Sequence, residues 1–239
     1  MSGAGGNRPP AAQRQPAVSQ LYGRRKGKKL RPRQAELLQE VLPRLALDAA
    51  QKVADLPGQF PQRPAQIWLE IGFGGGEHLV SQALAHPDIG FLGCEPFVNG
   101  VAKLLARVEA ENLENLRIFQ GNAAHLIMAL PDRSLERIFL LYPDPWPKRR
   151  QRKRRFLSDA MLADLARVMH SGAELRFATD IDDYAGWVLA RILRSPHFVW
   201  LAGSAADWQS AWEGWTSTRY EAKALAAGRR PVYLTFVRV

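Results

Sequence analysis

The chain has 239 residues, of which 46% are hydrophobic, and a formal net charge of +10. This length and composition predict one folded domain with appendages, and the positive charge favours a polyanionic partner such as nucleic acid. No uncharged apolar run reaches the ~18 residues that a membrane-spanning helix needs, and no secretory signal is visible. A single cysteine, Cys94, excludes an intrachain disulfide and a thiolate-rich zinc site. We therefore expect a cytoplasmic protein with no membrane association and no metal site.

The positive charge is concentrated in two segments. Residues 1–33 carry nine basic side chains and no acidic ones, and residues 148–155 carry seven basic side chains interrupted only by Gln151. The first of these segments opens with an aperiodic stretch rich in Gly, Pro, Ala and Gln. We predict that 1–33 form a disordered basic extension, either an arm for polyanions or a solubilising segment, and that 34–239 form the domain.

The hydrophobic pattern after residue 34 alternates between strands and helices. Predicted strands cover 66–72, 89–95, 116–120, 135–141, 174–179, 198–201 and 232–239. Predicted helices cover 35–41, 79–84, 98–112, 124–130, 156–169, 183–193 and 220–226. Such alternation implies right-handed βαβ crossovers, so we expect an α/β fold. We expect a single domain with a doubly wound, mostly parallel, seven-stranded sheet that helices cover on both faces.

A glycine-rich turn follows the first predicted strand. The segment from Glu70 to Gly76 reads EIGFGGG, and glycines there permit a tight turn and the close approach of a ligand. Glu77 stands where the dinucleotide-binding pattern requires a third glycine, and its negative charge disfavours a pyrophosphate. S-adenosylmethionine has no pyrophosphate, and its ammonium and sulfonium groups suit the carboxylate of Glu70. We therefore expect Glu70, Gly72 and Gly74 to bind S-adenosylmethionine.

Two more polar residues end the second and third predicted strands. Glu95 lies 23 residues after Gly72, a separation at which an acid accepts hydrogen bonds from ribose hydroxyls. Asn122 either meets the edge of an adenine or caps the helix that follows it. Together with the glycine turn, these positions resemble the cofactor side of class I methyltransferases.

Three alternating prolines follow the fourth predicted strand, in the segment YPDPWPK from Tyr142 to Lys148. Proline fixes its own φ and favours extended backbone at the residue before it, here Tyr142, Asp144 and Trp146. We expect a rigid ledge that holds Asp144 at the ligand-binding edge of the sheet. The adjoining basic residues would attract a phosphate backbone, and Trp146 either stacks on a base or belongs to the core.

Four strings occur in the order EIGFGGGE, PDPWPKRRQRKRRF, RFATD and TRYEAKALAAGRRPVY. On these motifs the chain resembles the bacterial tRNA (guanine-N7)-methyltransferase family from about residue 30 to the C-terminus. The resemblance implies a Rossmann-like class I methyltransferase that moves a methyl group from S-adenosylmethionine to N7 of a guanine in the variable loop of tRNA. The chain departs from the common family pattern at Gly75, Asn122, Gln151 and Arg152.

The resemblance also implies roles for individual residues. The cofactor would be contacted by Glu70, Glu95, Asn122 and Asp144, of which Asp144 would also be the catalytic residue. The substrate would be held by Lys148, Asp180, Thr218, Arg219, Tyr220 and Glu221, and RNA would be contacted by Arg150, Arg152, Lys153, Arg154 and Arg155. The expected partner is tRNA, with no obligate protein partner. The alternatives are a methyltransferase for another RNA or a small molecule, and a non-catalytic RNA-binding module with this fold.

The chemistry of guanine N7 limits what the site has to do. This nitrogen carries a lone pair and no proton, so its methylation needs in-line approach to the methyl group and no general base. The ring gains positive charge, which a carboxylate facing its N1–H and exocyclic amine stabilises. We expect Asp144 to do this and Asp180 to orient the base, unless Asp180 caps the helix after it. Thr218 and Glu221 also have the spacing of a capping box, which is the alternative to substrate binding.

Overall fold

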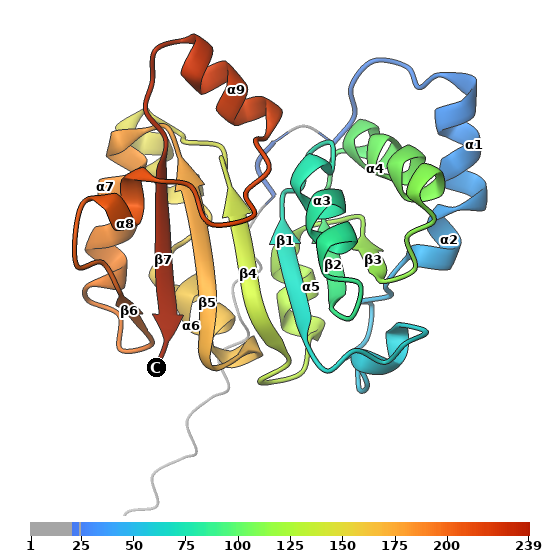
Figure 1. Cartoon of the computed structure of the whole chain (residues 1–239), viewed down its shortest axis with the longest axis horizontal. Coiled ribbons are helices and arrows are strands. Elements are labelled where there is room, and N and C mark those ends of the chain that lie inside the picture. Colours follow the sequence, from blue (N-terminus) through green and yellow to red (C-terminus); the bar gives the residue numbers. More distant parts are fainter. Residues whose placement is uncertain (1–20, 24) are drawn as a thin grey trace, which may run out of the picture.

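The computed structural model describes residues 21–23 and 25–239 (Figure 1). Seven strands of the described residues form one sheet: β1 (Ile67–Ile71), β2 (Gly90–Cys94), β3 (Leu116–Phe119), β4 (Leu135–Leu141), β5 (Met169–Thr179), β6 (Phe198–Trp200) and β7 (Val232–Arg238). Their order is β3-β2-β1-β4-β5-β7-β6, and in this described sheet β7 pairs antiparallel with β5 and β6 while the other pairs are parallel. The predicted α/β fold with a doubly wound, mostly parallel, seven-stranded sheet is confirmed.

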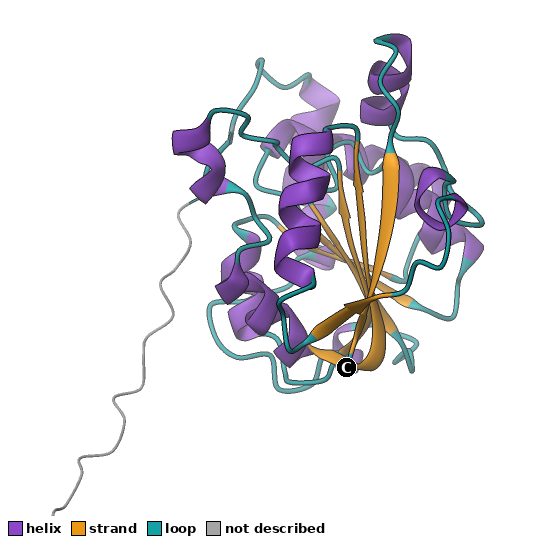
Figure 2. Cartoon of the chain, turned by 90° about the vertical axis from the view of Figure 1, so that its left-hand side faces the viewer, coloured by secondary structure: helices purple, strands orange, loops and turns teal. Residues whose placement is uncertain are grey.

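Helices cover both faces of the sheet, which Figure 2 shows with its strands fanning out between them. One face carries α1 (Pro32–Glu40), α3 (Glu77–Ala85) and α4 (Val98–Glu111), and the other carries α5 (Ala123–Ala129), α6 (Asp159–Val168) and α7 (Asp182–Ile192). Helix α9 (Arg219–Ala226) precedes β7, and short helices lie in the connections: α2 (Leu42–Leu45), α8 (Ala206–Gln209), η1 (Pro57–Gln59) and η2 (Arg149–Arg154). The hydrophobic pattern misses the short helices because so few residues show no periodicity. None of the described helices combines the length and apolarity needed to cross a membrane.

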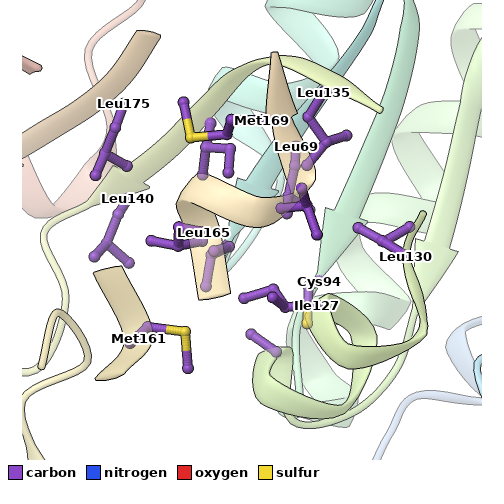
Figure 3. Packing of buried hydrophobic residues seen from close by; sticks show 14 of the residues in the cluster. Leu69, Cys94, Ile127, Leu130, Leu135, Leu140, Met161, Leu165, Met169 and Leu175 are labelled. Atoms are coloured by element: carbon purple, nitrogen blue, oxygen red, sulfur yellow. The ribbon is translucent and has the colours of Figure 1, made fainter. Parts of the chain in front are cut away.

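Two hydrophobic clusters fix the sheet between its helix layers. All residues of β1 and β2 are buried, as expected for central parallel strands with both faces covered. The cluster under α5, α6 and α7 includes Leu69, Leu140 and Leu165, which Figure 3 shows in close contact with their neighbours. The cluster under α1, α3 and α4 includes Phe91 and Leu104. The rigid sheet holds the ends of its strands in fixed positions.

Several element boundaries differ from those predicted, and two of the differences have a clear physical reason. Helix α6 begins at Asp159 and not at residue 156, because the side chain of Ser158 accepts a hydrogen bond of 3.2 Å from the backbone N–H of Met161 and caps the helix. Strand β5 begins at Met169 and not at residue 174. Polar residues and a glycine at 170–172 hide this part of the strand from the hydrophobic pattern.

The described part of the predicted N-terminal extension contacts the domain. Helix α1 begins at Pro32, before the predicted boundary at residue 34. The carbonyl of Arg25 accepts a hydrogen bond of 3.0 Å from Val98, and the side chain of Asn99 bonds to the backbone of Gly27 and of Lys28, each at 2.7 Å. The predicted disorder of 1–20 and of Arg24 lies outside the described residues, and the division into extension and domain stays a prediction.

Candidate active site

A cavity of about 670 Å³ opens at the carboxyl ends of β1 to β4. Volumes of roughly 300–1,000 Å³ are typical of small-molecule sites, and ligands of doubly wound sheets bind at this edge, where the strand order reverses between β1 and β4. Ten predicted site residues line the cavity: Gly72, Gly74, Glu95, Asn122, Asp144, Lys153, Arg154, Arg155, Arg219 and Tyr220. Seven do not: Glu70, Lys148, Arg150, Arg152, Asp180, Thr218 and Glu221.

The glycine turn after β1 is held to the end of β2 by Glu95. Gly72 and Gly74 have φ values of 76° and 58°, in the left-handed region that favours glycine. The backbone N–H of Gly74 donates to Oε2 of Glu95 at 2.8 Å, and that of Phe97 donates to Oε1 at 2.9 Å. Burial raises the pKa of Glu95, although these two hydrogen bonds and the charge of Arg219 oppose the shift. Each carboxylate oxygen keeps further acceptor capacity toward the cavity.

A glycine in α4 permits this turn to approach the helix. A Cβ atom added at Gly100 would lie 2.2 Å from the carbonyl oxygen of Gly74, which no real side chain tolerates. The turn, the end of β2 and the first residues of α4 therefore form one tightly packed wall of the cavity.

Glu70 lies behind the cavity wall. Its side chain is buried in β1, and its Oε2 lies 2.7 Å from Nδ1 of His78 in α3. The imidazole of His78 lies in turn against the rings of Phe139 and Trp215, with centroid distances of 4.7 and 5.0 Å. The predicted contact of Glu70 with the cofactor stays a prediction, since this carboxylate is engaged by a histidine that the sequence pattern did not single out.

The position of Asn122 is compatible with both of its predicted roles, the capping of a helix and a contact with the cofactor. It is the N-cap of α5, where its Oδ1 accepts a hydrogen bond of 3.1 Å from Ala124, and it also lines the cavity. Helix capping is therefore confirmed, and the contact with adenine stays a prediction.

The proline-containing ledge has an unexpected backbone. Tyr142 and Trp146, each followed by a proline, have φ values of 50° and 44°. The extended conformation predicted for them is therefore wrong: both lie in the left-handed region, which is strained for bulky residues. A backbone hydrogen bond of 2.8 Å from Tyr142 to Ala178 in β5 anchors this conformation. Between them Asp144 lines the cavity, and although the residue is exposed, desolvation by its surroundings raises the pKa of its carboxyl group.

Arg155 differs from the other residues of the basic segment in its burial. It is predicted to contact RNA, but the structure buries its side chain completely. Its guanidinium donates to the carboxylate of Asp183 and, at 2.8 Å, to the carbonyl of Pro145, and lies over the ring of Tyr184. Arg155 therefore ties the ledge to α7, and its predicted contact with RNA stays a prediction.

The other basic residues near the ledge are distributed over its surface. Arg152 forms an ion pair with Asp183 at 2.5 Å and stays partly exposed. Arg154 lies over the rings of Tyr22 and Trp146, 4.8 Å from each centroid. Lys148 and Arg150 are exposed outside the cavity, so their predicted RNA and substrate contacts stay predictions.

The box Thr218, Arg219, Tyr220 and Glu221 divides into a cavity-facing and a buried half. Arg219 and Tyr220 line the cavity. The hydroxyl of Thr218 accepts a hydrogen bond of 3.2 Å from the backbone of Glu221, which confirms the capping of α9.

The carboxylate of Glu221 is buried and accepts hydrogen bonds from the hydroxyl of Tyr233 and, at 2.8 Å, from Nε1 of Trp215. Burial alone would raise the pKa of Glu221, but hydrogen bonds, including those from Ser217 and Tyr233, hold it below its ordinary value. In this arrangement Glu221 anchors the box. Its predicted contact with the guanine edge stays a prediction.

Asp180 follows directly after β5 and does not line the described cavity. Its Oδ2 accepts a hydrogen bond of 2.5 Å from Nε of Arg229, in the loop that follows α9. The pair fixes this loop to the end of β5. The sequence pattern also missed several cavity residues, among them Tyr22, Phe156 and Tyr184, because only tertiary contacts bring such distant segments together.

Known proteins resemble this chain in sequence and in fold. Residues 64–234 match a family model described as "Putative methyltransferase". A tRNA (guanine-N(7)-)-methyltransferase of Rhodopseudomonas palustris (strain BisB5) is 53% identical over 220 residues, which cover 92% of this chain and 86% of the relative. The protein of the same name from strain BisB18 is 55% identical over 219 residues, covering 91% and 87%.

Among solved structures, the 16S rRNA methyltransferase KamB has a TM-score of 0.54 at 15% identity, covering 79% of this chain and 95% of that chain. At this identity the likeness concerns the fold alone. The sequence relatives share more than half of their aligned residues with this chain over nearly its whole length. The chain therefore belongs to the tRNA (guanine-N(7)-)-methyltransferase family.

Proposed function

We propose that this protein transfers a methyl group from S-adenosylmethionine to N7 of a guanine in tRNA. The observation that carries the proposal is the cavity itself. It gathers Gly72, Gly74, Glu95, Asn122 and Asp144 at one edge of the sheet, directly beside the basic helix η2. The relatives named for tRNA (guanine-N(7)-) methylation support the same activity. The sequence resemblance further implies that this guanine lies in the variable loop of tRNA.

The cavity residues fit S-adenosylmethionine. Glu95 offers both carboxylate oxygens at the position from which ribose hydroxyls are bound in such folds. The left-handed glycines leave the backbone of the turn open to close approach, and Asp144 supplies negative charge for a cation. When bound, the cofactor supplies an electrophilic methyl group on a positively charged sulfur.

Asp144 is the group that the reaction would use most directly. Guanine becomes cationic when its N7 is methylated, so a carboxylate near the ring stabilises the transition state more than the ground state. The prolines and the strained backbone on both sides hold Asp144 in place before the substrate arrives. Desolvation raises the pKa of Asp144, and a cation beside the carboxylate would favour its charged form.

The surface around the cavity would position the RNA. Arg150 and Lys153 belong to η2, and their charges suit a phosphate backbone. Such contacts fix the register of the substrate without touching the reacting atoms. Asp180, which follows β5 and pairs with Arg229, would orient the base.

Methyl transfer to purified tRNA tests the proposal. The protein is incubated with unmodified tRNA and methyl-labelled S-adenosylmethionine, and the digested nucleosides are separated. We expect label in 7-methylguanosine at a single guanine, which sequencing of the cleaved product locates. Ribosomal RNA and free guanosine serve as control substrates. Label in another nucleoside, or transfer to ribosomal RNA alone, would contradict the proposal.

A further inference from the structure

Arg219 belongs to the box predicted to hold the substrate, but its guanidinium lies over the cofactor side of the cavity. A Cβ atom added at Gly74 would lie 3.1 Å from Nη2 of Arg219, so the guanidinium covers the glycine turn directly. The positive charge of Arg219 also acts on Glu95. It lowers the pKa of this carboxyl group and so opposes the larger, raising effect of burial. Arg219 thus stands beside the two elements that bind the cofactor, the turn after β1 and the end of β2.

Two of the other three basic side chains that line the described cavity are engaged by neighbouring groups. Arg155 is buried and bonded to Asp183 and Pro145. Arg154 lies over two aromatic rings of the ledge, and Lys153 belongs to η2 beyond it. Among the described cavity residues, only Arg219 presents a positive charge to the glycine turn.

S-adenosylmethionine carries one anionic group, the α-carboxylate of its methionine part. A guanidinium is the side chain best suited to a carboxylate, because its planar donors match the two oxygens. We propose that Arg219 binds this α-carboxylate, and that Arg219 is a cofactor residue and not a contact for the RNA. The inference rests on the proposed function, since it takes S-adenosylmethionine as the ligand.

The rest of the box fixes Arg219 in this position. Glu221, two residues further on, is bonded to Trp215 and Tyr233, and Thr218 caps the same helix turn. Tyr220 also contacts the guanidinium of Arg219, which lies 4.9 Å from the centroid of its ring and donates a hydrogen bond of 3.3 Å to its hydroxyl. The anchored start of α9 therefore places a cation over the glycine turn, at the edge of the sheet toward which β1, β4 and β5 point in Figure 1.

Two ligands that differ in the methionine part test the assignment. S-adenosylhomocysteine has the α-carboxylate, and 5′-methylthioadenosine lacks the whole amino-acid group. Calorimetry with the full chain is carried out on the wild type, on Arg219→Gln and on Arg219→Lys. Lys223→Gln, an exposed residue of the same helix, is the matched control. Filter binding without cofactor gives the tRNA affinity of each variant.

We expect Arg219→Gln to weaken S-adenosylhomocysteine binding on the order of tenfold, the loss expected for a charge-assisted hydrogen bond. Binding of 5′-methylthioadenosine should change less than about twofold, and tRNA affinity should stay that of the wild type. Arg219→Lys should recover part of the loss because it keeps the charge.

Equal weakening of both ligands, or weaker tRNA binding with unchanged S-adenosylhomocysteine binding, would overturn the inference. If the wild type itself bound no S-adenosylhomocysteine, the proposed function would fail instead.

Discussion

Desolvation by the cavity wall acts on the two carboxyl groups that line the described cavity, that of the buried Glu95 and that of the more exposed Asp144. It raises the pKa of Glu95 and of Asp144, but backbone hydrogen bonds from Phe97 and Gly74 oppose the shift at Glu95. At Asp144 desolvation is the cause of the raised pKa. Two backbone donors therefore fix Glu95, whereas a cation beside Asp144 would offset the desolvation that raises its pKa. The two residues differ in environment more than in residue type.

Replacing Asp144 by asparagine should separate activity from stability. Asp144→Asn keeps the volume and removes the charge, so turnover should fall on the order of 10²-fold, the scale for one preorganised electrostatic group. Single-turnover methyl transfer measures this effect. Asp132→Asn, which removes a surface partner of Arg167, is the control and should retain its rate. A near-normal rate in Asp144→Asn would move the catalytic role to another residue.

The raised pKa of Asp144 also predicts a pH dependence. The wild-type rate should fall as pH drops through this raised pKa, and Asp144→Asn should lack that acid limb. The same raised pKa has the opposite effect on stability, which it favours at low pH and not at high pH. The folded protein holds the proton more tightly than the unfolded chain, so stability from this group is present below the unfolded pKa and is lost as pH rises through the folded pKa. Thermal unfolding of Asp144→Asn at neutral pH should therefore show no loss of stability, and a marked loss would contradict this account.

Glu95→Ala should damage both the cofactor site and the fold. The carboxylate receives the backbone N–H groups of Gly74 and Phe97, and alanine would leave these two donors without their partner. Each such loss costs about 1–3 kcal/mol, and cofactor binding should weaken by a similar amount. Calorimetry and thermal unfolding measure the two effects. Asp55→Ala, which removes a comparable exposed acceptor from Gly58, should leave cofactor binding unchanged. Unchanged cofactor affinity in Glu95→Ala would place the ribose contact elsewhere.

At the scale of elements, the sheet could be predicted because its central strands are apolar runs that end in polar or glycine residues. The same logic found Glu95, Asn122 and Asp144, since carboxyl ends of parallel strands meet at one edge. Helix η2 could not be predicted, because a run of cations has no hydrophobic period. The burial of Arg155 depends on its ion pair with Asp183 in α7. This partner is distant in sequence, so the local sequence around Arg155 does not predict the contact.

The basic residues of η2 and its end should therefore fall into two classes. The logarithm of the tRNA binding constant falls linearly with the logarithm of the salt concentration. Arg150→Gln and Lys153→Gln should each make this slope less steep by about 0.7–0.9, with little change in stability. Arg155→Gln should instead lower the free energy of unfolding by about 1–3 kcal/mol, because buried hydrogen bonds are lost. Binding at several salt concentrations and chemical denaturation test this. An unchanged stability of Arg155→Gln would show that the residue is not an anchor.

At the scale of the whole molecule, the site is completed by segments from both ends of the chain. Leu21, Tyr22 and Gly23 line the cavity from the N-terminal side, and Arg219 and Tyr220 line it from α9. Tyr22 lies 6.0 Å from the ring of Trp146, edge to face. The cavity is thus formed by the sheet edge together with two segments that lie nearly two hundred residues apart in sequence.

Two N-terminal deletions should have different effects. Removal of residues 1–20 leaves Tyr22 and the contacts of Arg25, Gly27 and Lys28 with α4 in place, so cofactor affinity and the thermal midpoint should stay close to wild type. Removal of residues 1–29 deletes these contacts together with one side of the cavity, so both quantities should fall. RNA affinity should fall in both cases, more strongly at low salt, because each deletion removes basic residues. Calorimetry with S-adenosylhomocysteine, thermal unfolding and tRNA binding at two salt concentrations distinguish the deletions. Identical cofactor affinity in the two proteins would show that the N-terminal segment lies beside the cavity without contributing to ligand binding.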